Sequence, residues 1–254
     1  MHRKTVGAVL VMCMLVFGVS GAWGEPIDPS AGQAPAATNT SSQWTFSLRP
    51  YLFLSGVAGS VTSGPFTVPI NSEFGEVVKN LQFGGFLTFS GERGKWGFYS
   101  DFQYISLVGE GTGILESKLR LTNTFAEADI TFRPDRAPTL RFLAGVRLYS
   151  INQTLSVMGE SLPNANTTVF DPIIGAHGNW RLHDRWQFEL RGDIGGFGVS
   201  SEFTYNLMAL FHWQLSDLFH VPFGYRVLGY QIDTGGVQMS TRMSGMVLGL
   251  DFRF

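Results

Sequence analysis

The sequence has one cysteine, little charge and no long apolar run beyond its first residues. The cysteine, Cys13, lies near the N-terminus, so the remainder of the chain has no disulfide or thiol chemistry. Charged residues make up 15% of the 254 positions, well below the ~25% of an average soluble domain. No apolar run of ~18 residues follows the N-terminal segment, so we expect no transmembrane helix. Thiol enzymes, disulfide-stapled folds and helical membrane proteins are therefore excluded.

The N-terminal segment has the features of a secretory signal peptide at residues 1–24. A basic start at positions 2–4 precedes an apolar run at 6–19, and Ala22 and Gly24 place small residues at −3 and −1. Its removal takes away basic residues only and makes the formal net charge more negative than −2. A negative chain argues against nucleic acid as a partner.

The sequence after the signal peptide divides into a leader and one domain. Residues 25–43 are rich in Pro, Ala, Ser and Thr and lack aromatic residues, which predicts a disordered leader. Residues 44–254 contain no later stretch that resembles a linker. We therefore expect residues 44–254 to form a single domain.

Within this domain, apolar and polar residues alternate with a period of two, the period of a strand with unlike faces. Each alternating segment is long enough for the ~9–11 residues of a tilted membrane-spanning strand. The pattern predicts an all-β fold, a closed antiparallel up-and-down transmembrane β-barrel of ten strands, with eight as the alternative and almost no helix. The predicted strands are 44–55, 80–91, 96–107, 119–133, 139–151, 169–181, 186–196, 202–214, 219–231 and 239–254.

The connections between these segments alternate in length, as in outer-membrane barrels with short turns on one side and longer loops on the other. The predicted short turns are 91–95, 133–138, 181–185 and 215–218. The predicted longer loops are 56–79, 108–118, 152–168, 197–201 and 232–238. With both termini on the short-turn side, the number of strands is even.

The tryptophans after the signal peptide all fall at the short-turn ends of this strand map. Tryptophan concentrates where a bilayer meets water, because its ring is apolar and its N–H seeks a polar partner. We therefore predict an aromatic girdle formed by Trp44, Trp96, Trp180, Trp186 and Trp213.

The polar face of the predicted strands carries arginine and carboxylates and almost no lysine. In the segment 186–196, for example, Phe188 and Leu190 alternate with Glu189 and Arg191. Arginine forms bidentate pairs with carboxylates, which suits a narrow lumen better than a solvated surface. We predict a network that holds the barrel closed, with conduction or ligand binding as the alternative role. The predicted lumen charges are Arg49, Asp101, Glu127, Arg147, Asp171, Glu189, Arg191, Asp193, Arg226 and Asp251.

The chain ends in the alternating sequence SGMVLGLDFRF, whose apolar face includes Phe252 and Phe254 and whose other face carries Asp251 and Arg253. We expect the apolar face to contact lipid and the last strand to pair with the first, near Trp44. A terminal aromatic residue also resembles the signal that the outer-membrane assembly machinery reads. Phe252 and Phe254 are therefore the predicted C-terminal assembly signal.

Several motifs together resemble a family of small, porin-like outer-membrane barrel proteins of Gram-negative bacteria, over most of residues 44–254. The motifs are Pro50-Tyr51, Gly94-Lys95-Trp96-Gly97 with Asp101, Asp171-Pro172 with Gly175, residues 191–198 (RGDIGGFG), and Gly224-Tyr225-Arg226. Phe53 and His177 depart from the pattern, since the family usually has a tryptophan and a bulkier residue there. The resemblance implies the barrel fold and the outer membrane, and it implies no reaction.

Enzymatic chemistry finds little support in the sequence. A protease of the omptin type needs Asp and His pairs at the outer rim, but the strand map places His177 and His212 in the lumen and His183 and His220 near short turns. A serine hydrolase needs a histidine within reach of its nucleophile, and Ser200 has none nearby in sequence. We predict no catalytic residues, no metal site and no cofactor.

The predicted function is an integral outer-membrane barrel with a charged, mostly filled lumen and a structural role or an unidentified ligand. Lumens of about eight strands are filled by side chains, and inward glycines at 175, 195, 224, 245 and 249 are expected to leave wet space. A narrow porin-like channel is the alternative, and a surface enzyme or adhesin acting through loops 56–79 and 152–168 is the second. The expected partners of a monomer are outer-membrane lipid, the barrel-assembly machinery and periplasmic chaperones.

Overall fold

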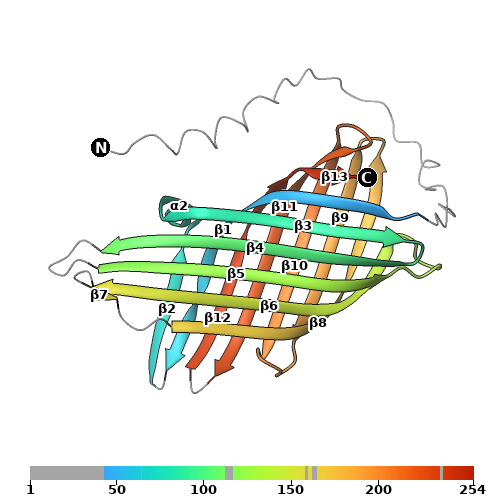
Figure 1. The fold of residues 1–254 in the computed structure, drawn as a ribbon. Coiled ribbons are helices and arrows are strands. Elements are labelled where there is room, and N and C mark those ends of the chain that lie inside the picture. The colour runs from blue at the N-terminus through green and yellow to red at the C-terminus, as the bar shows by residue number, and fades with distance from the viewer. Residues whose placement is uncertain (1–42, 64, 112–116, 158–159, 162–164, 235–236) are drawn as a thin grey trace, which may run out of the picture. The chain divides into compact units, whose positions relative to one another are not determined.

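The computed structural model describes residues 43–254 except 64, 112–116, 158–159, 162–164 and 235–236. The predicted signal peptide, with Cys13, and almost all of the predicted leader lie outside the described residues. The described part is an antiparallel β-barrel, drawn in Figure 1.

The barrel consists of long strands and one short helix, in the order in which the chain runs. They are β1 (Thr45–Ser63), β2 (Phe66–Ser72), α2 (Phe74–Lys79), β3 (Leu81–Arg93), β4 (Trp96–Gly111), β5 (Ser117–Phe132), β6 (Leu140–Val157), β7 (Glu160–Ser161), β8 (Ala165–His183), β9 (Trp186–Gly196), β10 (Phe203–Gln214), β11 (Phe219–Thr234), β12 (Val237–Gly249) and β13 (Asp251–Arg253). No helix in the described part of the chain is long and apolar enough to cross a membrane.

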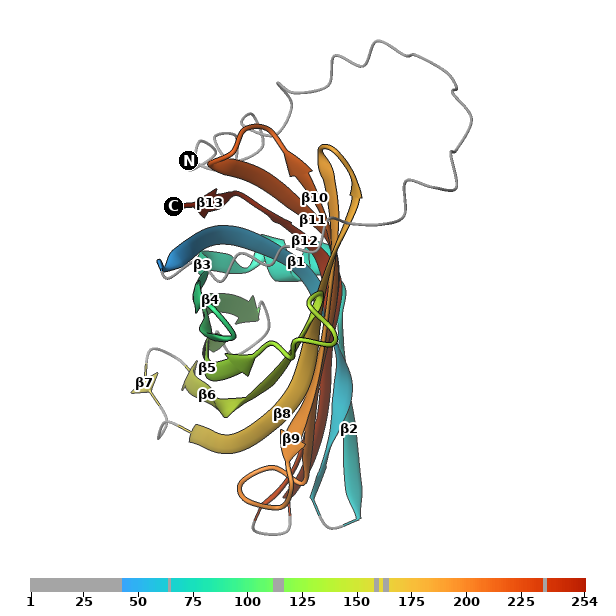
Figure 2. The same ribbon diagram turned by 90° about the vertical axis from the view of Figure 1, so that its right-hand side faces the viewer.

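The wall closes because β1 pairs with β3 on one side and with β12 and β13 on the other. β12 and β13 are two parts of one strand, interrupted at Leu250. This residue lies opposite Pro50, which has no N–H to donate across the ladder. Counting them as one strand, and leaving out the short β2 and β7, the wall has ten strands. The prediction of a closed ten-stranded up-and-down barrel is confirmed, and Figure 2 shows how the strands curve around it.

The start of β1, the C-terminus and the short turns lie at one end of the barrel, which we call the short-turn end. The backbone N–H of Phe46 donates to the carbonyl of Phe254 at 2.7 Å, and the N–H of Phe254 donates back at 3.0 Å. Between β3 and β4, only Gly94 and Lys95 form the turn, and Gly94 has the positive φ of 62° that such a hairpin requires. The first and last strands therefore form the closing seam that the alternation predicts.

At the opposite end, which we call the long-loop end, the strands are longer than the sequence pattern indicates. The expected loop 56–79 is instead the upper part of β1, the strand β2 and the helix α2. The apolar face of β1 ends at Leu54, and Gly56, Ala58 and Ser60 follow outward. Backbone pairing does not need an apolar face, so a hairpin continues beyond the segment that the alternation identifies.

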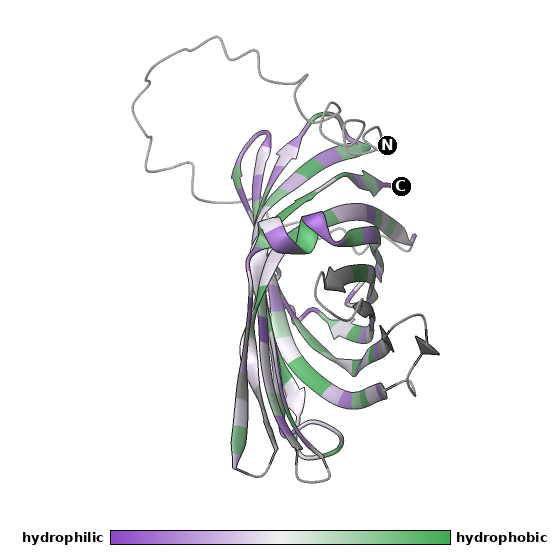
Figure 3. Ribbon diagram, turned by 90° about the vertical axis from the view of Figure 1, so that its left-hand side faces the viewer, coloured by the Kyte–Doolittle hydropathy of each residue, from purple (hydrophilic) through white to green (hydrophobic). Residues whose placement is uncertain are grey.

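The outer face of the wall is apolar and the inner face carries charge, which is the reverse of a soluble protein. Leu207 and Met246 are 51% and 52% exposed on the outer face, whereas Arg147 and Asp171 are fully buried. Figure 3 shows apolar and polar residues following each other along the strands. Outward apolar and inward charged side chains are the arrangement of a barrel in lipid.

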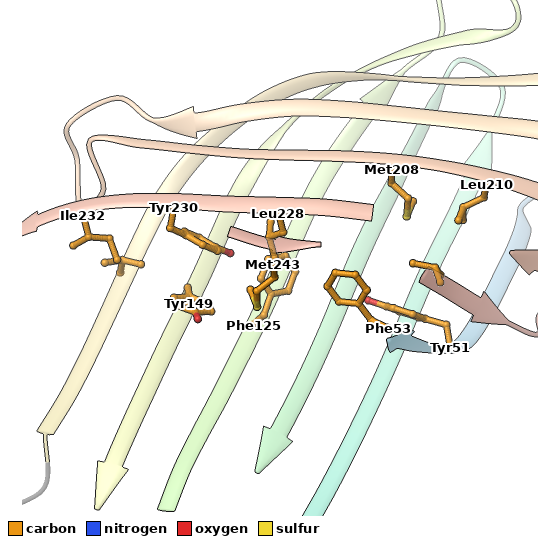
Figure 4. Close-up of a cluster of buried hydrophobic side chains, with 12 residues drawn as sticks. Tyr51, Phe53, Phe125, Tyr149, Met208, Leu210, Leu228, Tyr230, Ile232 and Met243 are labelled. Carbon is orange, nitrogen blue, oxygen red and sulfur yellow. The ribbon is translucent and has the colours of Figure 1, made fainter. Parts of the chain in front are cut away.

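The interior has an apolar cluster as well as charged side chains. Tyr149 and Tyr230 stack with their ring centroids 4.4 Å apart, next to Phe125 and Met243 (Figure 4). On β1, β6 and β11, the members of this cluster lie nearer the long-loop end than the buried arginine of the same strand. The cluster contains Tyr51, Phe53, Phe125, Tyr149, Val169, Met208, Leu210, Leu228, Tyr230, Ile232, Met243 and Val247.

Candidate functional site

Arg147 of β6 is at the centre of a buried charge network in the lumen. Its Nε and one terminal nitrogen donate to Glu127 of β5 at 2.8 and 2.5 Å. The same terminal nitrogen donates to Asp193 of β9 at 2.5 Å, and the other donates to Thr204 of β10 at 3.2 Å. One guanidinium thereby connects four strands of the wall.

Arg191 of β9 joins the same carboxylates from the other side. It donates to Glu127 and, at 2.7 Å, to Asp129 of β5, and its Nε donates to Asp193 at 3.1 Å. The guanidinium carbon lies 4.1 Å from the ring centroid of Tyr99, which adds a cation–π contact. Arg147 and Arg191 therefore share Glu127 and Asp193 in one hydrogen-bonded group.

Arg226 of β11 extends this group across the lumen to β4 and β1. It donates to Asp101 at 2.8 Å, to the Tyr51 hydroxyl at 3.0 Å and to the side-chain carbonyl of Asn206 at 2.9 Å. Tyr51 in turn donates to Asp101 at 2.7 Å, and Asn206 donates to Asp193 at 2.9 Å. Asn206 thus connects Arg226 to the group around Arg147.

A second charged group lies nearer the short-turn end, around Glu189 of β9. Arg49 of β1 donates to both carboxylate oxygens of Glu189, at 3.4 and 3.0 Å. The Nε2 atom of His212 lies 2.6 Å from Glu189, and that of His177 lies 3.4 Å away. Asp251 is 3.7 Å from Arg49 and accepts from Arg253 at 3.1 Å. This group connects β1 to β9 across the barrel.

Asp171 of β8 does not join either group. Its carboxylate accepts from the backbone N–H of Ser201 at 2.8 Å. Ser201 is fully buried, so the β9–β10 connection folds inward over this carboxylate. The structure therefore brings together nine of the ten predicted lumen charges in two groups, and it places the tenth against a loop.

The network also contains residues that sequence reasoning missed. Asp129 follows Glu127 by two positions, and Thr204 and Asn206 share one face of β10 with His212, which the strand map already placed in the lumen. Tyr99 precedes Asp101 by two positions and faces the same way. The period of two could have identified Asp129 and Tyr99, which share a face with the predicted charges Glu127 and Asp101, and Thr204 and Asn206, which share a face with the predicted lumen residue His212.

The tryptophans and the terminal phenylalanines lie at the short-turn end. Trp186 and Trp213 are register partners, and their rings stack with centroids 6.3 Å apart. Trp44 stacks on Phe46, and Phe46 also contacts Phe254 at a centroid distance of 5.9 Å. The remaining two, Trp96 and Trp180, lie at the start of β4 and near the end of β8. Aromatic side chains therefore collect along this rim.

The glycines expected to leave wet space do not do so. A Cβ atom on Gly224 would collide with the carbonyl oxygen of Ala209, and one on Gly175 would collide with that of Gly192. Neighbouring strands approach so closely there that backbone already occupies the space. These glycines permit the tight coiling of the wall and do not widen the lumen.

The lumen offers little for catalysis or metal binding. Among the described residues, no cluster of His, Cys, Asp and Glu has the geometry to hold a metal ion. The histidines of the lumen contact Glu189, and the hydroxyl of Ser47 donates to Asp251. A nucleophilic serine needs a histidine as its base, and within the described ranges no serine hydroxyl donates to one.

The architecture identifies the kind of protein. Closed antiparallel barrels with an even number of strands, an outward apolar face and a polar interior are built for the outer membrane of Gram-negative bacteria. This chain has all of these features. It is an integral outer-membrane β-barrel protein, as the sequence resemblance implies.

Comparisons with known proteins give structural likenesses only. No protein-family model and no curated protein matches the chain. The outer-membrane protease OmpT of Escherichia coli is similar with a TM-score of 0.48 and 12% identity, over 87% of this chain and 100% of that one. The attachment invasion locus protein Ail of Yersinia pestis, in complex with a heparin analogue, has a TM-score of 0.44 and 11% identity, over 84% and 99%. These two proteins have different named roles, so they assign no activity to this chain.

Proposed function

We propose that this protein is a sealed structural barrel, with no catalytic activity, whose ion-pair network closes the lumen and ties opposite walls together. The observation that carries the proposal is the cross-lumen pairing of buried guanidinium groups. Arg226 connects β11 to β4, and Arg49 connects β1 to β9. Side chains that bridge the lumen occupy the path that a solute would take.

The composition of the lumen supports sealing over conduction. A channel needs sites weak enough for an ion to leave, but here each of Arg147, Arg191 and Arg226 already donates to at least two partners. The apolar cluster adds buried aromatic and aliphatic side chains, which extend toward the long-loop end. Polar and apolar layers in series oppose the passage of both ions and apolar solutes.

Planar-bilayer recording tests the sealed lumen. We expect no unitary current from the wild-type protein at several hundred millivolts, because the side chains paired across the lumen occupy the path that an ion would take. The double variant Arg226→Ser with Asp101→Ser removes both charged partners of one cross-lumen pair and should produce a small leak. Regular single-channel steps from the wild-type protein would contradict the proposal and favour the narrow channel.

We also propose that Phe252 and Phe254 form the signal through which the assembly machinery recognises this barrel. Their position supports this, since Phe254 ends the closing seam and pairs with Phe46. The variant Phe254→Ala should reach the outer membrane in severalfold smaller amounts, as measured by heat-modifiable migration of membrane fractions. Unaided refolding into detergent micelles is the control. Equal loss in that assay would mean that Phe254 acts only through seam packing.

A further inference from the structure

The barrel wall has a gap in its backbone pairing between β1 and β3. These strands pair only where Thr45–Pro50 faces Leu87–Glu92. Farther along, β1 pairs with β2 from Val57 onward. Residues 51–56 of β1 and 81–86 of β3 thus each have a paired strand on one side only, and we call the space between them the β1–β3 window. In Figure 1, β1 lies beside β3 at one end and then turns away from it.

The window is bounded on every side by the chain. The Pro50–Leu87 pair is its lower limit, toward the short-turn end. At the upper limit, a Cβ atom on Gly56 would lie 3.0 Å from the carbonyl oxygen of Ser72, and the N–H of Val108 donates to Asn80 at 2.8 Å. The segment carrying α2 therefore runs from β1 to β4 across the top of the opening.

The strands are separated at the window. A Cβ atom on Gly85 would meet only the ring of Phe83, a residue of β3 itself. In the paired part of the same strand, a Cβ atom on Gly91 would contact Phe46 of β1 at 2.9 Å. Both glycines face outward on β3, but only Gly91 has β1 beside it. β1 has therefore moved away from β3 by the level of Gly85.

The window lies within the lipid-facing part of the wall. Leu52 on β1 and Phe83 and Leu87 on β3 are exposed on the outer face around it, and Phe74 and Val78 of α2 are exposed above it. In hydrocarbon, backbone groups without a partner are costly. Along an antiparallel strand, the backbone N–H and C=O groups of every second residue point toward the same neighbouring strand. In β1, the backbone groups of Tyr51, Phe53 and Ser55 therefore point toward the window, where no strand pairs with them.

The inner side of the window is aromatic. Tyr51 and Phe86 pack with their ring centroids 5.5 Å apart, and Phe53 belongs to the apolar cluster of the lumen. Below them, the Tyr51 hydroxyl is held by Arg226 and Asp101. An apolar chain that entered from the membrane would meet aromatic rings and end against a charged layer.

We propose that the β1–β3 window is a lateral binding site for one acyl chain of a membrane lipid. The chain enters between Leu52 and Phe83, lies against Tyr51, Phe53 and Phe86, and shields the unpaired strand edges from the surrounding lipid. The site opens into the apolar part of the lumen and ends at the charged layer, so binding needs no path to the short-turn end. Conductance measurements therefore test the sealed lumen, and crosslinking tests the acyl-chain site, so one proposal can be wrong while the other holds.

Photocrosslinking tests the site. The wild-type protein is refolded into vesicles of a phospholipid that carries a diazirine in its acyl chain, irradiated, and mapped by mass spectrometry. We expect adducts on the inward residues Tyr51, Phe53 and Phe86 as well as on outward residues. Leu143 and Ile173, which are also inward and buried but lie outside the apolar cluster, on β6 and β8, should stay unlabelled. Adducts confined to outward-facing residues would overturn the proposal.

A glycine substitution supplies a second measurement. Gly84 lies at the window and faces inward, so Gly84→Trp should reduce the inner adducts at least fivefold. The matched control is Gly192→Trp, which fills an apolar groove of about 310 Å³ on the outer wall of β8–β10 and should leave the inner adducts unchanged. Heat-modifiable migration identifies which variants fold, and the wild-type adduct map decides the question if Gly84→Trp does not. If the wild-type protein gives no inner adducts and forms a dimer on irradiation, a second copy of the chain covers the window and the proposal is wrong.

Discussion

Arg147→Met lowers the free energy of unfolding by about 3–5 kcal/mol, the range for removing one partner of a buried ion pair. The substitution keeps an unbranched side chain but removes the guanidinium. One oxygen of Glu127 and one of Asp193 then lose their charged donor in a lumen where Arg147 is 0% exposed. Equilibrium unfolding in urea, with the protein folded in detergent micelles or vesicles, measures the change.

Arg141→Met is the matched control, because it removes the same group from the same strand. The side chain of Arg141 pairs with Glu92, whose side chain is 41% exposed near the short-turn end. Pairs of this kind contribute about 0–1 kcal/mol. If both variants lose the same small amount, water fills the lumen around Arg147 and the sealed network is wrong.

Leu207→Arg lowers the free energy of unfolding by about 2–4 kcal/mol, the cost of arginine on the lipid face near the midplane of a bilayer. Leu207 lies in the middle of β10, where it pairs with Gly192 and Val227. It is 51% exposed on the outer wall. The effect depends on the surrounding lipid, so it is measured with the protein folded into vesicles.

Leu218→Arg is the control for depth. Leu218 is similarly exposed, at 55%, but it lies in the turn between β10 and β11. Arginine near the interface costs only about 0–1 kcal/mol. Equal costs at both positions would indicate that β10 does not cross the membrane as the outward apolar face requires.

The strand map follows from local pattern, and the structure confirms it closely. The period of two identifies the face of each strand without knowledge of its neighbours, because successive side chains of a strand must point to opposite sides. The prediction was less accurate at the long-loop end. There the backbone ladder of β1 and β2 continues through residues with no apolar face to mark it.

Partner choice inside the lumen does not follow from the pattern. The sequence indicates that Arg49 and Glu189 both face inward, but they are 140 positions apart and meet only because the closed barrel places β1 across from β9. The burial of Ser201 against Asp171 depends on how one connection folds inward. Such contacts depend on strand register and barrel curvature, which local alternation does not specify.

By itself, the sequence determined that this chain is a barrel with an apolar outside, a charged inside and a seam between its first and last strands. These features need only the two-residue period and the scarcity of charge. The tertiary structure alone decided which charges pair and that β1 leaves β3 above Pro50. It also decided that neighbouring backbone occupies the space beside the inward glycines. The physical reason is that a closed sheet fixes distances between residues far apart in the chain, whereas alternation reports only which way each side chain points.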